Sequence, residues 1–404
     1  MRLREQATLV AAAGSKLCIS RNLLSLLVVV AYVLSLPALA SDPPTKDGQP
    51  NVLAEFNIAK GGRPITLPVK IREREYLFLL DTGTSYSTFD TSLTNLLGTS
   101  VGVRPLVTLG GPIKAPFFDP PEAFLGPLDL RQGGLINAVD LENFRRVIGR
   151  DVRGMLGMGF LKNYVVRVDF DSAKLQFRRW DGRSHPEWGT AVHLVKPTED
   201  NILPFANARP PWGGNMLFCV DSGCDSSVSM VTNAFARATD QAVIAQGLAA
   251  TAAGVRHDRS GRLTSLTLGG FEHRGLVVNE DNSNVIGLRI LSHYVVTFDF
   301  PGMKMYLQKG QAFDKPDEVD MSGLHLWCIG DRITVHAVDD GSPASTAGIK
   351  PEDVVLKVGE QSASAIDIYD LRDLLKSGDG KEIKMTLKRG EEQKVVTFTL
   401  KQPI

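Results

Sequence analysis

Two short stretches of the sequence place an aspartate directly after a run of apolar residues and directly before a glycine. The first reads LFLLDTGTS at residues 77–85, and the second reads LFCVDSGCD at residues 217–225. Each pattern predicts a buried strand that ends at a turn, where the glycine lets another part of the backbone approach the carboxylate closely. A single Asp-x-Gly is ordinary turn chemistry, so the functional interpretation depends on the second copy.

Asp81 and Asp221 would meet if the two copies packed around a twofold axis. Two carboxylates in contact do not both ionise easily, so one keeps a proton while the other is charged. Such a pair supplies a base that takes a proton from water and an acid that protonates a peptide carbonyl oxygen. We therefore predict Asp81 and Asp221 as catalytic residues, in a reaction that requires no metal and no other cofactor.

The repeat extends well beyond these two loops. Each is followed by an apolar-apolar-Gly step, at residues 155–157 and 285–287, and then by a strand-like run, YVVRVDF at 164–170 and YVVTFDF at 294–300. Such a duplication predicts two similar units, here residues 53–185 and 186–308. Short β-type runs with Gly and Pro between them predict a mostly β fold, with one helical candidate at residues 233–253.

This ordered duplicate resembles the two catalytic loops of the aspartic protease family, and its short halves are most similar to the retropepsin-like bacterial members. The resemblance covers about residues 53–308 and implies two retropepsin/pepsin-like lobes around Asp81 and Asp221. It also implies roles for the residues that support the loops: interlocking hydroxyls, amides that bond the carboxylates, and the fourth position of each motif. These are Thr82, Gly83, Thr84, Ser222, Gly223 and Cys224. Cys224 departs from the Thr, Ser or Ala that the family usually has there.

The same resemblance implies a hairpin that closes over substrate. In the first half, TLGGPIKAPFF at residues 108–118 is the candidate hairpin. The matching stretch in the second half is TLGGFEHRGL at residues 267–276, which shares the Thr-Leu-Gly-Gly sequence.

A separate unit is expected at residues 321–404, after a polar linker at 309–320. Its stretch GSPASTAGIKPEDVVLKVG, residues 341–359, resembles the PDZ domains of bacterial envelope proteases. The resemblance implies that a peptide adds to a sheet edge, beside an amphipathic helix in DIYDLRDLLKS at 367–377. The peptide-binding loop would contain Gly323, Leu324, His325 and Leu326. The alternative is a PDZ domain used only for packing within the molecule or for assembly.

The N-terminus has the pattern of a targeting segment. Basic residues precede an apolar run at 23–36, and Ala38-Leu39-Ala40 supplies a cleavage pattern, which predicts a secretory signal peptide at residues 1–40. The alternative is an uncleaved helix that anchors the protein in a membrane. Either predicts an exported protein, periplasmic or extracellular, with a Pro-rich linker at 41–52. Only three cysteines follow this segment, so we expect no disulfide framework.

Composition restricts the partners. The 404 residues include 45 Lys+Arg and 45 Asp+Glu, and this balance gives no basic excess for nucleic acid. The expected partners are polypeptide substrates and peptide ligands of the PDZ domain. The leading hypothesis is an exported aspartic endopeptidase. The alternatives are a non-catalytic peptide-binding scaffold that acts through its PDZ domain, and a homodimer in which each half pairs with its twin.

Overall fold

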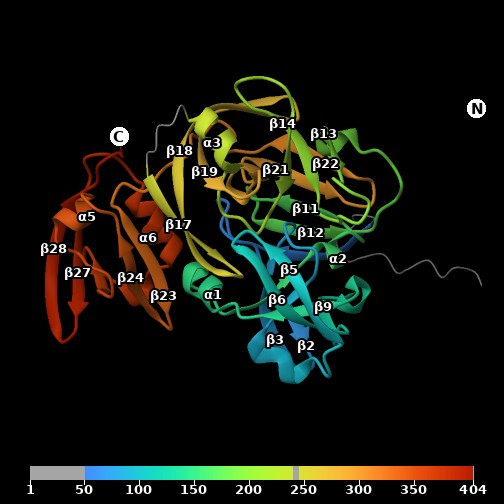
Figure 1. The fold of residues 1–404 in the computed structure, drawn as a ribbon, viewed down its shortest axis with the longest axis horizontal. Coiled ribbons are helices and arrows are strands. Elements are labelled where there is room, and N and C mark those ends of the chain that lie inside the picture. The colour runs from blue at the N-terminus through green and yellow to red at the C-terminus, as the bar shows by residue number, and fades with distance from the viewer. Residues whose placement is uncertain (1–50, 240–244, 404) are drawn as a thin grey trace, which may run out of the picture. The chain divides into compact units, whose positions relative to one another are not determined.

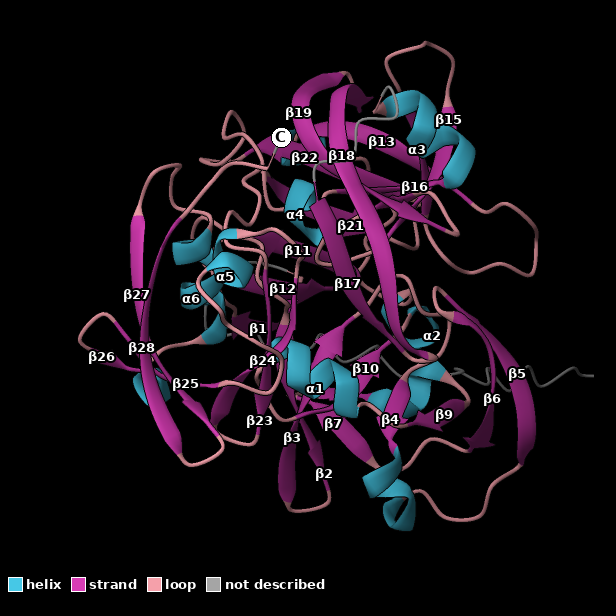
Figure 2. Cartoon of the chain, turned by 60° about the vertical axis from the view of Figure 1, so that its left-hand side comes forward, coloured by secondary structure: helices cyan, strands magenta, loops and turns pink. Residues whose placement is uncertain are grey.

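The computed structural model describes residues 51–239 and 245–403. The expected signal peptide and nearly all of the linker at 41–52 lie outside these residues. The described chain is mostly β, as predicted, and Figure 2 shows short helices between many strands. None of the helices in the described part of the chain is long and apolar enough to cross a membrane.

The first half forms a nine-stranded sheet in the order β5-β6-β9-β4-β10-β3-β2-β7-β8. Alternate residues of β2, such as Leu67, Val69 and Ile71, are buried in its core, as the period of a half-buried strand requires. The strands are β2 (Thr66–Ile71), β3 (Arg74–Leu80), β4 (Thr88–Asp90), β5 (Gly102–Thr108), β6 (Gly111–Phe118), β7 (Ala123–Leu125), β8 (Leu128–Asp129), β9 (Ile136–Val139) and β10 (Val152–Leu156). The helices are η1 (Thr91–Leu96), η2 (Leu130–Gly133), α1 (Glu142–Ile148) and α2 (Met158–Leu161).

Strands of the second half continue a larger, 13-stranded sheet. They are β14 (Phe205–Arg209), β15 (Met216–Val220), β16 (Val228–Val231), β17 (Ala245–Thr251), β18 (Gly254–Leu268), β19 (Phe271–Asp281) and β20 (Val285–Ile286), with the helices α3 (Thr232–Ala238) and α4 (Leu288–Leu291). The helix predicted at 233–253 is confirmed where it overlaps α3 and is wrong at residues 245–251, while residues 240–244 lie outside the described chain. Residues 245–251 pair with β18 along their whole length, and this ladder overrides the helical preference of their alanines.

Both halves contribute three strands to the remaining part of that sheet, in the order β1-β12-β11-β21-β22-β13. These are β1 (Val52–Asn57), β11 (Val165–Asp169), β12 (Lys174–Arg178), β13 (Thr190–Val195), β21 (Tyr294–Asp299) and β22 (Lys304–Lys309), with η3 (Pro186–Trp188) before β13. Strands β11 and β21 lie side by side and antiparallel (Figure 1), with Arg167 opposite Thr297. These two residues occupy the same position in the duplicated YVVxxDF, so a local twofold axis passes through this pair.

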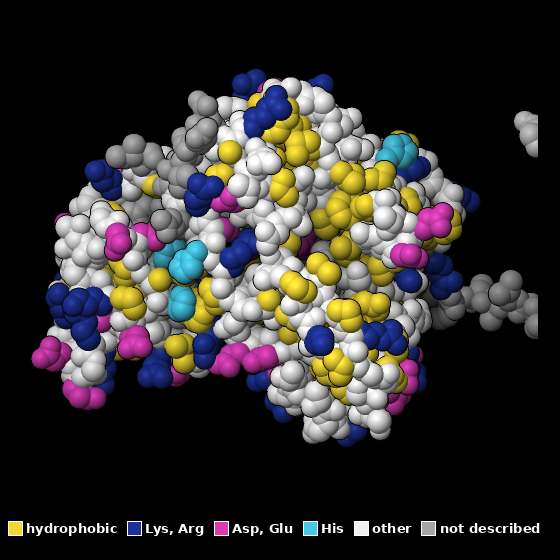
Figure 3. Space-filling view, in the orientation of Figure 1, with side chains coloured by type: hydrophobic (Ala, Val, Ile, Leu, Met, Phe, Trp, Pro, Cys, Tyr) yellow, Lys and Arg dark blue, Asp and Glu magenta, His cyan; other side chains and the backbone are white. Residues whose placement is uncertain are grey.

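The C-terminal unit has a six-stranded sheet and a hydrophobic core of its own. Its elements are β23 (Leu324–Ile329), β24 (Arg332–Val338), α5 (Pro343–Thr346), β25 (Val354–Val358), β26 (Gln361–Ser362), η4 (Ala363–Ala365), α6 (Ile368–Leu375), β27 (Glu382–Arg389) and β28 (Glu392–Thr399). The expected linker at 309–320 is fixed in place, because the Asp317 carboxylate accepts a hydrogen bond from the Val277 amide at 2.7 Å. On the face shown in Figure 3, acidic, basic and apolar side chains are interspersed.

Candidate active site

The loops that follow β3 and β15 meet and exchange hydrogen bonds. Thr82 Oγ1 donates to the Val220 carbonyl at 2.6 Å and accepts from the Ser222 amide at 3.0 Å. Ser222 Oγ donates to the Leu80 carbonyl at 2.9 Å and accepts from the Thr82 amide at 3.1 Å. Both side chains are 1% exposed. Each hydroxyl therefore satisfies two buried backbone groups of the opposite loop and holds the two halves in register.

This exchange of hydrogen bonds between Thr82 and Ser222, the interlock, brings Asp81 and Asp221 together. The Gly83 amide donates to Asp81 Oδ1 at 2.9 Å, and the Gly223 amide donates to Asp221 Oδ1 at 2.8 Å. Each carboxylate also lies against the glycine of the other loop. A Cβ on Gly83 would be 2.2 Å from the Asp221 carboxyl carbon, and a Cβ on Gly223 would be 2.6 Å from that of Asp81. Only glycine leaves room for both carboxyl groups.

Burial makes it costly for both aspartates to be charged. Burial, followed by the negative charge of Asp221, raises the pKa of Asp81 well above its usual range. Burial also raises the pKa of Asp221, but hydrogen bonds from the Gly223 amide, Asp81 and the Cys224 amide oppose the shift. Because both pKa values are raised and the two carboxyl groups interact, a state in which the pair shares one proton is favoured over a state in which both are charged. This arrangement provides an acid and a base at one place.

The two apolar-apolar-Gly segments, residues 155–157 and 285–287, hold both loops through backbone hydrogen bonds. The Leu156 carbonyl of β10 accepts from the Asp81 amide at 3.1 Å, and the Ile286 carbonyl of β20 accepts from the Asp221 amide at 2.9 Å. The glycine that ends each segment is required by close packing. A Cβ on Gly157 would lie 2.4 Å from the Tyr86 carbonyl oxygen, and the corresponding distance from Gly287 to the Ser226 carbonyl is 2.2 Å.

The fourth positions of the two motifs, Thr84 and Cys224, occupy equivalent places. The Thr84 carbonyl accepts from the Met158 amide at 2.8 Å, and the Cys224 carbonyl accepts from the Leu288 amide at 2.6 Å. Cys224 Sγ lies 3.1 Å from Ser226 Oγ. Burial raises the pKa of the Cys224 thiol to about 12, so it remains protonated. The cysteines of the described chain, Cys219, Cys224 and Cys328, are all free.

Two hairpins meet near these loops. The first is β5–β6, which contains the predicted TLGGPIKAPFF hairpin. Its tip contacts the tip of β17–β18, because a Cβ on Gly110 would lie 2.0 Å from Thr251 Oγ1. The neighbouring Leu109 carbonyl accepts from Arg256 at 3.0 Å and from Asn282 at 3.2 Å. Arg256 also lies close to Cys224, which places the hairpin tips near the loop that contains Asp221.

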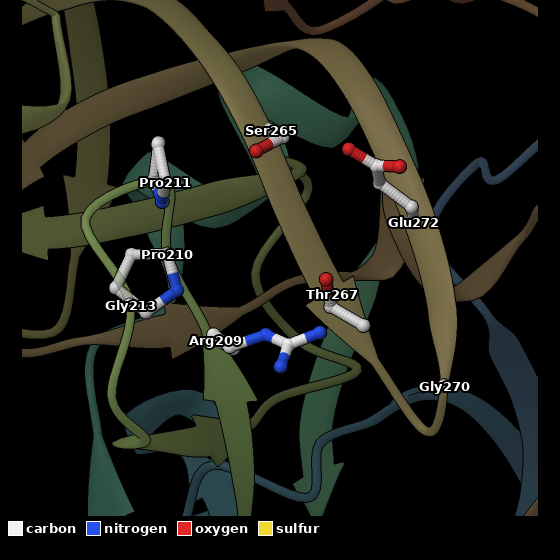
Figure 4. A pocket seen from close by; sticks show the side chains of 8 residues that line it. All are labelled: Arg209, Pro210, Pro211, Gly213, Ser265, Thr267, Gly270 and Glu272. Atoms are coloured by element: carbon white, nitrogen blue, oxygen red, sulfur yellow. The ribbon is translucent and has the colours of Figure 1, made fainter.

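The hairpin predicted in the second half, at residues 267–276, is not the hairpin that contacts β5–β6. Thr267 and Leu268 end β18, and Gly269 and Gly270 form the turn to β19. Figure 4 shows that Thr267, Gly270 and Arg209 face a separate cavity of about 490 Å³. The hairpin opposite β5–β6 is β17–β18, and only its first strand, β17, lies in the stretch predicted as helix. The shared Thr-Leu-Gly-Gly therefore marks two turns, one at the tip of β5–β6 and the other at the tip of β18–β19.

Sequence reasoning also missed an ionic cluster beside the hairpin tips. Arg256 Nη1 pairs with Asp281 Oδ1 at 2.8 Å. Burial raises the pKa of Asp258 to about 6, the charges of Asp281 and Asp225 add to the shift, and Arg256 opposes it. These residues come from β18, β19 and the loop that follows Asp221, so no local pattern could identify them. Within residues 51–239 and 245–403, no group of His, Cys, Asp or Glu side chains converges as a metal site.

The predicted peptide-binding loop of the C-terminal unit lies at the start of β23. Gly323 has a positive φ of 74°, and Leu324 and Leu326 are buried in the core of this unit. His325 Nε2 contacts Asp339 Oδ1 at 2.8 Å. The structure therefore brings these four residues together, but uses three of their side chains for internal contacts.

Comparisons with known proteins identify one part of the chain. Residues 334–389 match the family model of the PDZ domain, so the C-terminal unit contains a PDZ domain. A solved structure titled photosystem II D1 C-terminal processing protease is similar at 21% identity, with a TM-score of 0.21. That similarity covers 24% of this chain and 26% of the other, so the chain spans about a quarter of that protein. The comparison with curated proteins found no match.

Proposed function

We propose that the chain is an aspartic endopeptidase in which a water molecule is activated between Asp81 and Asp221. The observation that carries this proposal is the exchange of hydrogen bonds between Thr82 and Ser222, which brings the carboxyl groups of Asp81 and Asp221 together. A buried acid–base pair of this kind suits the hydrolysis of an amide by general acid–base catalysis.

The reaction would use the two aspartates in complementary roles. Asp221 takes a proton from water as the water oxygen attacks the peptide carbonyl carbon, and Asp81 gives its proton to the carbonyl oxygen. The tetrahedral diol then collapses: Asp221 protonates the leaving amine, the C–N bond breaks, and a hydroxyl proton returns to Asp81. The pair ends with one proton, as it began, and no covalent intermediate forms with the enzyme.

The substrates we propose are extended or unfolded polypeptides. A substrate strand would lie beneath β5–β6 and β17–β18, whose tips touch at Gly110 and Thr251 in this structure and must separate to admit it. The N-terminal sequence supports export to the periplasm or the cell exterior, with membrane anchoring if the segment at 1–40 is retained. Both aspartates come from one chain, which supports a site complete in a monomer.

A second candidate is a protein that binds peptides without cleaving them. The match of residues 334–389 to the PDZ domain supports peptide binding. Cys224, in place of the usual small hydroxyl or methyl side chain, favours a protein that does not hydrolyse peptides. The two candidates differ in one measurable property, the hydrolysis of a peptide bond.

The test is cleavage of denatured casein by the purified protein from pH 3 to 8. It includes Asp81→Asn and Asp221→Asn, a statine-containing transition-state inhibitor, and Asp331→Asn as a control at an exposed turn. We expect either active-site substitution and the inhibitor to abolish cleavage, and the control to leave it unchanged. Persistent cleavage by Asp81→Asn would refute the mechanism, and no cleavage by the folded wild type would favour the peptide-binding alternative.

A further inference from the structure

The peptide groove of the PDZ domain lies between β23 and α6. Strand β23 is at the edge of its sheet, and no other strand of the described chain pairs with its outer side. In PDZ domains an extended peptide adds to such an edge. Three groups of contacts show that this groove is already occupied by the chain itself.

The first group concerns the loop that would hold a terminal carboxylate. The Asp320 carboxylate accepts from the Ser322 and Gly323 amides, each at 2.8 Å. Ser322 Oγ accepts from the Leu324 amide at 3.1 Å. The consecutive amides at 322–324 are therefore bonded to a carboxylate and a hydroxyl of the same chain, which leaves none of the three for the C-terminus of a ligand.

The second group closes the groove. Helix α1 lies beside β23 in both views (Figures 1 and 2), and Gly149 directly follows its last residue. A Cβ on Gly149 would lie 2.9 Å from Cys328 Sγ of β23 and 2.9 Å from Ile368 Cγ2 of α6. Both walls therefore close on this glycine. Further along the groove, Arg372 of α6 donates to the Leu326 carbonyl of β23 at 2.9 Å.

The third group of contacts consists of ion pairs between arginines of the first half and aspartates of the PDZ domain. Asp367, Asp370 and Asp373 follow one another at intervals of three, so they share one face of α6. Arg150 contacts Asp367 at 3.2 Å, and Arg63 contacts Asp370 at 2.6 Å and Asp373 at 2.9 Å. Arginines from the first half thus cover the acidic face of the PDZ helix.

We propose that the PDZ groove is a docking site for the chain's own segment at residues 146–150, assisted by Arg63. The external ligand that replaces this segment is an internal, basic stretch of polypeptide and not a free C-terminus. Binding of that ligand separates the PDZ domain from the first half. Because the two occupants compete, the measured affinity for the external peptide equals the affinity of the open groove multiplied by the fraction of molecules in which the groove is open. The inference does not depend on hydrolysis at Asp81 and Asp221.

A disulfide trap tests the docking. A disulfide places each Cβ roughly 3 Å from the partner sulfur, which matches the 2.9 Å between a Cβ at Gly149 and Cys328 Sγ. We expect Gly149→Cys to cross-link to Cys328 under mild oxidation, as measured by mass spectrometry of peptides without reduction. Gly98→Cys is the control, because Gly98 also has a positive φ and nothing lies within 4 Å of its Cβ position. Failure of folded Gly149→Cys to cross-link would contradict the docking.

Binding of a defined peptide tests the ligand class. The probe is fluorescein-labelled FRRVIGRDV, which is the chain's own residues 144–152, measured by fluorescence anisotropy with the full protein. We expect the double variant Arg63→Ala/Arg150→Ala to bind it about tenfold more tightly than the wild type. Cross-linked Gly149→Cys should not bind until the disulfide is reduced. An amidated probe should bind like the free acid, and the acidic peptide FEEVIGEDV should not bind.

Each alternative outcome would overturn a specific part of the proposal. Equal binding by cross-linked and reduced Gly149→Cys would show that the segment does not cover the groove. Binding that requires the free C-terminus would reassign the groove to terminal carboxylates, and equal binding of the acidic peptide would exclude charge recognition. Absence of binding by the double variant would reject the proposed ligand class.

Discussion

Replacing Thr82 with valine tests how strongly the two halves are held together. Valine keeps the shape of threonine but removes the hydroxyl, so the Val220 carbonyl loses its 2.6 Å donor and the Ser222 amide loses its 3.0 Å acceptor. Both backbone groups lie in a region with almost no exposed surface. Each unsatisfied buried group costs about 1–3 kcal/mol, so we expect Thr82→Val to lower the free energy of unfolding by roughly 2–6 kcal/mol.

Urea unfolding followed by far-UV circular dichroism measures this change. The matched control is Thr94→Val, because the Thr94 hydroxyl bonds the Thr91 carbonyl at 2.9 Å in an exposed position and should contribute less than about 0.5 kcal/mol. Thr82→Val should also reduce peptide hydrolysis, because the two aspartates lose a fixed separation. A Thr82→Val protein as stable as the control would refute the role that we assign to the interlock.

Three further predictions concern ionisable groups. Asp258 has a pKa raised to about 6, so its folded form keeps a proton that the unfolded chain has already released. The free energy of unfolding of the wild type then falls as the pH rises from about 4 to 6. In thermal melts, Asp258→Asn should be more stable than the wild type by up to about 3 kcal/mol at pH 7 and equally stable at pH 4. Asp90 has a pKa lowered to about 2, so its contribution is complete above pH 4 and is lost as the pH falls toward 2. Asp90→Asn should cost about 2 kcal/mol at pH 7 and nothing at pH 2; an equal loss at both values would contradict the assignment. Finally, the raised pKa values of Cys219 and Cys224 predict that neither thiol reacts with iodoacetamide at pH 8 in the folded protein. Detection of either cysteine in alkylated form by mass spectrometry would contradict this prediction.

The mostly β fold was predictable because its strands carry a strong local signal. Alternation in β2 and apolar runs such as those before Asp81 and Asp221 identify strands without reference to distant residues. The duplication added long-range information, because two copies of one loop in one chain suggested that they meet. The structure places them together, with Gly157 and Gly287 each packed against a carbonyl of the adjoining loop.

The errors arose where distant contacts determine structure. Residues 245–251 contain several alanines, yet they form β17 because β18 supplies a partner for every residue. The contact between Arg256 and the Leu109 carbonyl joins residues 147 positions apart, and no spacing in the sequence indicates it. The PDZ signature predicted a peptide groove, but only the folded chain shows Asp320 bonded to the amides of the loop and Gly149 between its walls.

The most direct test of the central claim is the pH dependence of kcat/KM for a quenched fluorescent peptide, measured for the wild type, Asp81→Asn and Asp221→Asn. The shared proton predicts a bell-shaped wild-type profile whose two apparent pKa values belong to the pair. Each substitution should lower kcat/KM by about a thousandfold or more at the optimum, because acid–base catalysis contributes about 10²–10⁴. A variant that retains wild-type kcat/KM, or a rate independent of pH from 3 to 8, would contradict the account.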